Sequence, residues 1–214
     1  MFAYCGNNPV MLTDHTGHCA CAWKAHCPGH NLSYKQDEAK IKKNSTPAVK
    51  PIQQADSSTN CYSYALRVVK KNINIEFRKY DPGTIEHNGD KKYAAPDGSS
   101  ANTVLSYVIN DLDYLEWTYT TGVKANTPIP AGSSMLALRV GTVGGRWDYH
   151  FMAKNSSDSN WSFKGGVDGP VFQVADGLTP NDISWDNYKL ENDSWVTDKA
   201  NRYTGTIEYV MITP

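Results

Sequence analysis

The chain has 214 residues, 40% of them hydrophobic, which is enough for one well-packed domain and an additional segment. Its formal net charge is -1, and residues 81–214 carry 17 acidic against 10 basic side chains, so this larger part lacks the positive field that a nucleic-acid partner requires. No run of about 18 apolar residues is present, so we expect no membrane span.

Residues 1–17 are rich in turn formers. Residues 4–10 read Tyr-Cys-Gly-Asn-Asn-Pro-Val and lead to Asp14-His15-Thr16-Gly17. This segment resembles the end of the repeat-associated core of Rhs/YD-repeat proteins, with His15 in place of a proline. In that family the core forms a shell and the variable segment after it is a toxin. The resemblance implies a toxin that is secreted, or delivered into a target cell, as part of a larger protein, and whose producer needs a cognate immunity protein.

Residues 18–56 read as a His/Cys-rich junction followed by a polar linker. Seven His and Cys side chains fall between residues 15 and 30, and zinc takes four nitrogen or sulfur ligands. Zinc bound by Cys19, Cys21, Cys27 and His30 is one alternative, although the spacing fits no zinc finger. A flexible linker without any cofactor is the other.

The folded body is expected over residues 57–214. Apolar side chains at helical spacing predict a helix over 60–71, capped by Ser58 or Thr59, and a second over 99–113. Residues 72–98 are rich in loop formers. The helices precede the strands with no βαβ alternation, so we predict an α+β fold with the first helix packed on an antiparallel sheet. The predicted strands are 116–121, 134–140, 147–154, 160–164, 171–174 and 204–213.

Cys61 lies in the first turn of the first predicted helix, where unpaired amides and the helix dipole favour a thiolate. A buried structural cysteine is the alternative. His150 lies in a predicted strand that should cover this helix, and it is one of two histidines outside the N-terminal cluster. If Tyr149 and Phe151 face one way along that strand, His150 faces the other. We predict that Cys61 is a nucleophile and that His150 is its base.

Three short segments carry a second resemblance. They are Asn-Cys-Tyr-Ser-Tyr-Ala at 60–65, Asp-Tyr-His-Phe at 148–151, and Asn-Trp-Ser-Phe-Lys-Gly-Gly at 160–166. Together they resemble papain-like cysteine peptidases and amidases in the NlpC/P60 style, over roughly residues 57–214. The resemblance implies a papain-like, NlpC/P60-like fold and a third polar residue, from the next strand, that orients the histidine.

The third residue stays open among Asn160, Asp158 and Ser162. Asn160 has an amide oxygen that can accept from the imidazole, Asp158 is a carboxylate in a predicted turn, and Ser162 is a weaker acceptor. The oxyanion donors should include the backbone N–H of Cys61. Papain-like enzymes use a glutamine upstream of the cysteine, which implies that Gln54, or Gln53 beside it, supplies a second donor.

These residues predict a Cys-His hydrolase, whether protease, amidase or deamidase, that works through an acyl-enzyme. Its target would be a protein, a peptidoglycan peptide or a lipid ester. Two alternatives remain: a zinc-stabilised, non-enzymatic binding module, and a transglutaminase-type acyl transferase that uses the same Cys61 and His150 but transfers the acyl group to an amine instead of water.

Overall fold

The structure is a computed structural model and describes residues 48–53, 59–70, 79–166, 169–191 and 194–214. All of these residues belong to one unit, Pro47–Pro214. Several predictions lie outside the described residues: the Rhs-like segment 1–17, the junction and linker up to residue 47, and Gln54. The zinc candidates Cys19, Cys21, Cys27 and His30 also lie outside them.

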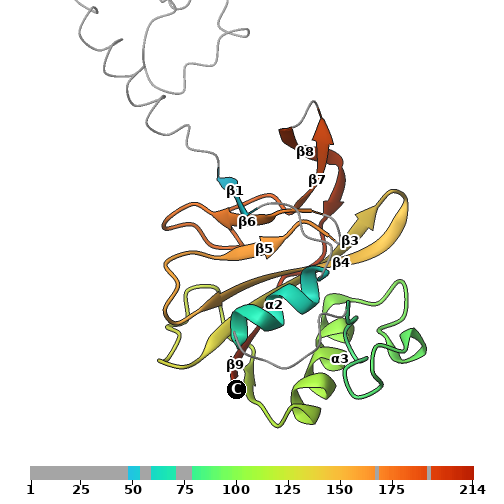
Figure 1. The fold of residues 1–214 in the computed structure, drawn as a ribbon, viewed down its shortest axis with the longest axis vertical. Helices are drawn as coiled ribbons and strands as arrows, with labels where there is room; N and C mark the ends of the chain where they lie inside the picture. The colour runs from blue at the N-terminus through green and yellow to red at the C-terminus, as the bar shows by residue number, and fades with distance from the viewer. Residues whose placement is uncertain (1–47, 54–58, 71–78, 167–168, 192–193) are drawn as a thin grey trace, which may run out of the picture. The chain divides into compact units, whose positions relative to one another are not determined.

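The described chain is built mainly from strands, with two α-helices and one short 3-10 helix (Figure 1). The elements are, in order, β1 (Val49–Gln53), α2 (Cys61–Val69), η3 (Lys91–Tyr93), α3 (Ala101–Tyr114), β2 (Thr118–Thr121), β3 (Ser134–Val143), β4 (Arg146–Asn155), β5 (Ser162–Lys164), β6 (Val171–Val174), β7 (Asp186–Glu191), β8 (Ser194–Tyr203) and β9 (Glu208–Thr213).

The strands form one antiparallel sheet with the order β1-β6-β5-β4-β3-β8-β7, and β9 joins β3 to β2. One side of β3 pairs with β4 along its whole length, and the other side is shared between two strands. β9 pairs with Ser134–Leu138, and β8 pairs with Gly141 and Thr142. A Cβ at Gly141 would overlap the backbone of β8, so the close approach of β8 requires glycine at this position.

This sheet is a half-barrel, and strands far outweigh the two short α-helices among the described residues. The prediction of a papain-like, NlpC/P60-like α+β fold is therefore wrong. The prediction missed the hairpin of β7 and β8, which covers residues 186–203. That segment is rich in Asn, Asp and Lys, which local propensity assigns to loops, whereas long-range pairing makes it a sheet.

Two apolar cores lie on opposite faces of the sheet. α2 and α3 cover one face, with α2 in front of β4 and α3 below it in Figure 1, and their apolar stripes share one core with Phe151 and Ala153 of β4. The opposite face is packed with aromatic side chains together with Met152. Successive residues of β4 therefore belong to different cores, as strand geometry requires.

A buried carboxylate holds the helical layer together. Asp111 of α3 accepts from the hydroxyl of Tyr62 on α2 at 2.8 Å and from the backbone N–H groups of Gly83 and Ile85 at 2.7 and 2.9 Å. Burial raises the pKa of this carboxyl to about 6, and the three hydrogen bonds oppose that shift. Asp111 thus ties α2, α3 and the loop 81–89 into one layer.

Candidate functional site

Cys61 is the first residue of α2. The side chain of Asn60 caps this helix by accepting from the N–H of Ser63 at 2.9 Å. The thiol donates to the carbonyl oxygen of Tyr149 at 3.8 Å, and the residue is only 6% exposed. Burial, and then the negative charge of Asp148, raise the pKa of the Cys61 thiol to about 12. The helix start therefore does not produce the thiolate that the sequence predicts there.

His150 lies on the other face of β4. Its ring stacks on Tyr203, with centroids 5.0 Å apart, and meets Phe163 and Trp185 edge-on. Burial lowers the pKa of His150 to about 3, and its Nε2 atom has no hydrogen-bond partner. The thiol and the imidazole are thus separated by the sheet, and this arrangement has no path for direct proton transfer between them.

Acidic and phenolic groups from both faces of β4 act electrostatically on the thiol instead. The hydroxyl of Tyr149 donates to Asp81 Oδ1 at 2.6 Å, and the hydroxyl of Tyr203 donates to Asp148 Oδ2 at 2.8 Å. Burial is the main cause that raises the pKa of Tyr149, and the charges of Cys61 and Asp81 add to it. Sequence reasoning missed this cluster because its members come from three separate segments. Two of these segments, around Asp81 and Tyr203, lie outside the predicted helices and strands.

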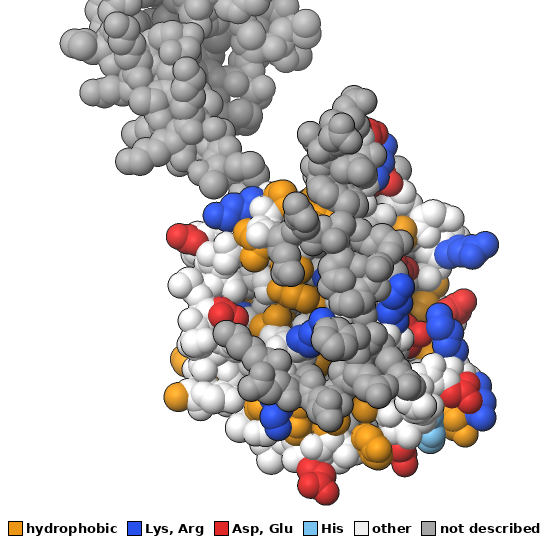
Figure 2. Space-filling view, viewed as in Figure 1, with side chains coloured by type: hydrophobic (Ala, Val, Ile, Leu, Met, Phe, Trp, Pro, Cys, Tyr) orange, Lys and Arg blue, Asp and Glu red, His pale blue; other side chains and the backbone are white. Residues whose placement is uncertain are grey.

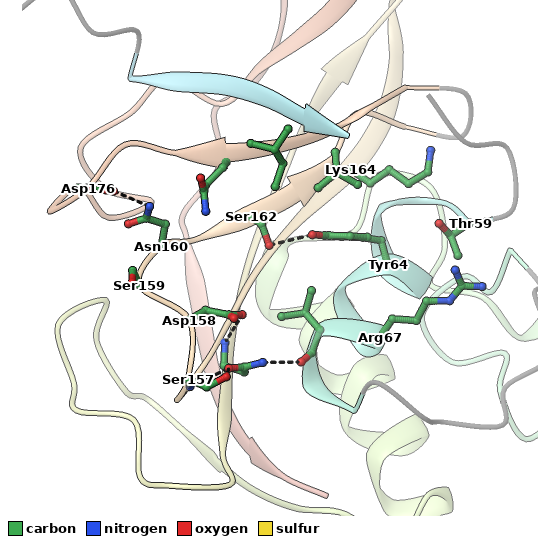
Figure 3. A pocket seen from close by; sticks show the side chains of 15 residues that line it. Thr59, Tyr64, Arg67, Ser157, Asp158, Ser159, Asn160, Ser162, Lys164 and Asp176 are labelled. Atoms are coloured by element: carbon green, nitrogen blue, oxygen red, sulfur yellow. Dashed lines mark hydrogen bonds between the residues drawn. The ribbon is translucent and has the colours of Figure 1, made fainter. Parts of the chain in front are cut away.

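The three candidates for the third catalytic residue do come together. Asp158, Asn160 and Ser162 line one open pocket between α2 and the strands β5 and β6 (Figure 3). Its volume is about 800 Å³. Neither Cys61 nor His150 lines it. The supporting residues of the predicted triad are therefore grouped, whereas its nucleophile and its base lie elsewhere.

A pair of hydroxyls crosses this pocket. Tyr64 reaches from α2 toward β5 and donates to Ser162 Oγ at 2.9 Å (Figure 3). Burial raises the pKa of Tyr64, so the phenol stays protonated at neutral pH. Lys164 lies two residues further along β5, on the same face as Ser162, and it is buried. Its ammonium donates to the carbonyl oxygens of Gly166 and Gly169 at 3.1 and 2.8 Å. Lys164 thus stabilises the loop that follows β5.

Asn160 lies in the pocket wall with one unsatisfied atom. Its Nδ2 donates to Asp176 Oδ1 at 2.6 Å. A carboxylate only accepts, so this bond fixes which way the amide points. The Oδ1 atom is then left buried without a hydrogen-bond partner. Because this oxygen has almost no exposed surface, a group in the open pocket does not reach it.

Two members of the pocket could have been found from the sequence. Tyr64 stands three residues after Cys61 on the predicted helix, one turn along the same face. Lys164 alternates with Ser162 on a predicted strand. Asp176 has no such signal, because only the pairing of β5 with β6 brings it beside Asn160.

No metal centre is found among the described residues, and the face drawn in Figure 2 carries side chains of both charges. Among the described residues, no group of three or more His, Cys, Asp or Glu side chains is placed to hold a metal ion. Basic and acidic side chains alternate over the described face in Figure 2. No described helix is long and apolar enough to cross a membrane.

The chain matches no family model, no curated protein and no solved structure.

Proposed function

We propose that the described domain is the effector part of a larger toxin and that it binds a polar, peptide-like ligand in the pocket between α2 and β5. The observation that carries this proposal is the open pocket itself, whose wall presents the hydroxyls of Tyr64 and Ser162 beside apolar side chains.

The rest of the lining fits the same class of ligand. The hydroxyls of Tyr64 and Ser162 can each donate and accept, which suits the alternating N–H and C=O groups of a peptide. Ile52, Val68 and Val171 add apolar surface at the same pocket. A few placed polar groups on a partly apolar wall are typical of small-ligand sites.

The test is binding of capped tripeptides, acetyl-Gly-X-Gly-amide with X varied, to the full ¹⁵N-labelled chain. We expect amide shifts concentrated at the pocket residues, and weaker shifts in Tyr64→Phe, which removes a hydroxyl from the pocket wall. The matched control is Tyr114→Phe, which removes an exposed hydroxyl on α3 outside the pocket and should bind as the unmodified chain does. The proposal fails if no peptide shifts the pocket residues or if Tyr64→Phe binds equally well.

A second candidate is the hydrolase that the sequence predicts, with Cys61 as the nucleophile. It is favoured by one observation: Cys61 contacts the backbone of Tyr149, so α2 begins against the segment of β4 that contains His150. Since His150 faces away, the thiol proton would have to pass to another group, and Asp148 and Asp81 are the two carboxylates whose charges act on the thiol.

A thiol-directed acyl probe followed by peptide mapping separates the two candidates. A hydrolase of this kind acylates selectively at Cys61, and the labelling falls in Asp148→Asn while it persists in His150→Leu. Acylation confined to the other cysteines of the chain would remove this candidate and leave the binding function standing.

A further inference from the structure

The hairpin of β7 and β8 closes over the ring of His150. Tyr203, at the end of β8, stacks on this ring with centroids 5.0 Å apart, and Trp185, the residue before β7, meets it edge-on at 6.0 Å. The backbone N–H of Tyr203 donates to the carbonyl oxygen of Trp185 at 2.9 Å, so both rings belong to the base of one hairpin. Phe163 of β5 is the third ring in contact with the imidazole. Opening of the hairpin therefore removes two of the three rings that bury His150.

The hairpin is joined to the sheet by a short stretch of pairing. β8 pairs with β3 at Gly141 and Thr142, whereas β4 pairs with β3 along its whole length. On β7, Tyr188 stacks on Phe172 of β6 with centroids 4.1 Å apart. Figure 1 shows most of the hairpin projecting from the sheet. Segments held by few long-range contacts open at lower free energy than the whole domain, so the hairpin can open by itself.

A proton on His150 has no partner in the closed structure. Its Nε2 atom is buried without a hydrogen-bond partner. Across the ladder His150 pairs with Arg139 of β3, and directly paired side chains lie on the same face of a sheet. The guanidinium of Arg139 donates to the carbonyl oxygen of Gly205 at 2.7 Å. Protonation would thus place a second cation opposite Arg139, inside a core of aromatic rings.

The carboxylates near the ring are already engaged. Asp148 lies on the same face of β4, and its Oδ2 accepts from the hydroxyl of Tyr203 at 2.8 Å. Asp186, which begins β7, lies 2.9 Å from Nε of Arg202 on β8. The contact from β5 is an uncharged ring. Burial alone lowers the pKa of His150, so neither carboxylate offsets a charge on the imidazole.

We propose that His150 makes closure of the β7–β8 hairpin depend on pH: protonation of the imidazole in mild acid favours a state in which the hairpin has left the sheet while the rest of the domain stays folded. Below pH 6.5 the open hairpin lets His150 bind a proton that the closed hairpin excludes. Since burial lowers the pKa from 6.5 to about 3, the open population rises about 25-fold between pH 7 and pH 5. This behaviour does not depend on which ligand the pocket between α2 and β5 binds.

The test is native-state hydrogen exchange of the full ¹⁵N-labelled chain, followed by NMR at pH 7 and pH 5 in 0–1 M urea. We expect the amides of β7 and β8 to open at lower free energy than those of β3 and β9, with little dependence on urea. After correction for the intrinsic exchange rate, their open population should be about 25-fold larger at pH 5 than at pH 7. A single opening free energy shared by the hairpin and β3 would overturn the proposal.

His150→Phe is the decisive variant, because it keeps a ring against Tyr203 and removes the titrating group. It should abolish the rise in the open population at the hairpin, and His150→Leu should do the same if phenylalanine is not accommodated. The matched control is His87→Phe, which removes a partly exposed imidazole that stacks on Tyr93 and should keep the 25-fold rise. A rise that persists in both His150 variants would assign it to the carboxylates and overturn the proposal.

Discussion

Replacing His150 by leucine should make the domain less sensitive to acid. The imidazole lies 5% exposed among Tyr203, Phe163 and Trp185, and burial lowers its pKa from 6.5 to about 3. Below pH 6.5 the unfolded chain binds a proton that the folded chain excludes. The free energy of unfolding therefore falls as the pH falls from 6.5 toward 3, and this loss is absent above pH 6.5.

The size of this effect follows from the shift in pKa. One pKa unit corresponds to about 1.4 kcal/mol. The buried His150 should therefore lower the free energy of unfolding by about 1 kcal/mol at pH 5.5 and by about 3 kcal/mol at pH 4.5. Asp111 acts in the opposite direction, because its pKa is raised to about 6 and its contribution is largest in acid. Both His150→Leu and the unmodified chain contain Asp111, so its pH-dependent contribution to stability cancels when the two proteins are compared.

The assay is urea unfolding at pH 7.0, 5.5 and 4.5, followed by tryptophan fluorescence. The stability of His150→Leu relative to the unmodified chain should rise by about 1 and then about 3 kcal/mol across this series. Met152→Leu is the control, because Met152 is buried on the same face of β4 and does not titrate. A difference that stays constant with pH would refute the buried, neutral His150 and would restore it as a candidate base.

Three further substitutions or treatments test other parts of the structure. Tyr62→Phe removes a hydrogen bond to the buried Asp111 carboxylate and should lower the free energy of unfolding by about 1.5–3 kcal/mol, measured in urea at pH 7. Gly83→Ala places a Cβ against the ring of Tyr107 at φ +89° and should cost at least about 1–3 kcal/mol in the same assay. Iodoacetamide should label Cys61 at least about tenfold more slowly in the native chain than in urea, as quantified by peptide mapping, because the thiol is buried and its pKa is raised.

The local elements with a strong pattern were predictable from the sequence. The helix over 60–71 is observed as Cys61–Val69, and the helix over 99–113 as Ala101–Tyr114. The cap of the first helix was misassigned, since Asn60 rather than Ser58 or Thr59 accepts from the first turn. Cap positions depend on one hydrogen bond, which periodicity alone does not locate.

The overall architecture was harder to predict because it depends on pairing between distant segments. The alternating strands β4 and β9 were predicted, but β7 and β8 were not. Their polar composition is typical of loops. Their hairpin joins the sheet through the pairing of β8 with Gly141 and Thr142 of β3. A pattern within ten residues has no information about such a contact.

The pocket was predictable where its residues are neighbours in sequence. Asp158, Asn160 and Ser162 fall within five residues, so a turn followed by a strand keeps them together. The sequence suggested them as orienting groups for His150, and the structure places them around Tyr64 instead. Their proximity was therefore predictable, whereas their partner was not.

The separation of Cys61 from His150 is decided by which alternate side chains of β4, odd-numbered or even-numbered, face the helices. The alternation of Tyr149 and Phe151 against His150 was expected, and what remained open was which set faces the helix. α2 buries an apolar stripe, and Phe151 packs on Tyr62 with ring centroids 4.9 Å apart, so the odd-numbered side chains take the helix side. Shifting the register of β4 by one residue would bring His150 to Cys61 only by moving its aromatic side chains out of the helical core. Any chemistry at Cys61 must therefore use a group other than His150. Asp148 has the same parity as His150, but its charge acts on the thiol, which is why Asp148→Asn and His150→Leu should differ in the labelling experiment.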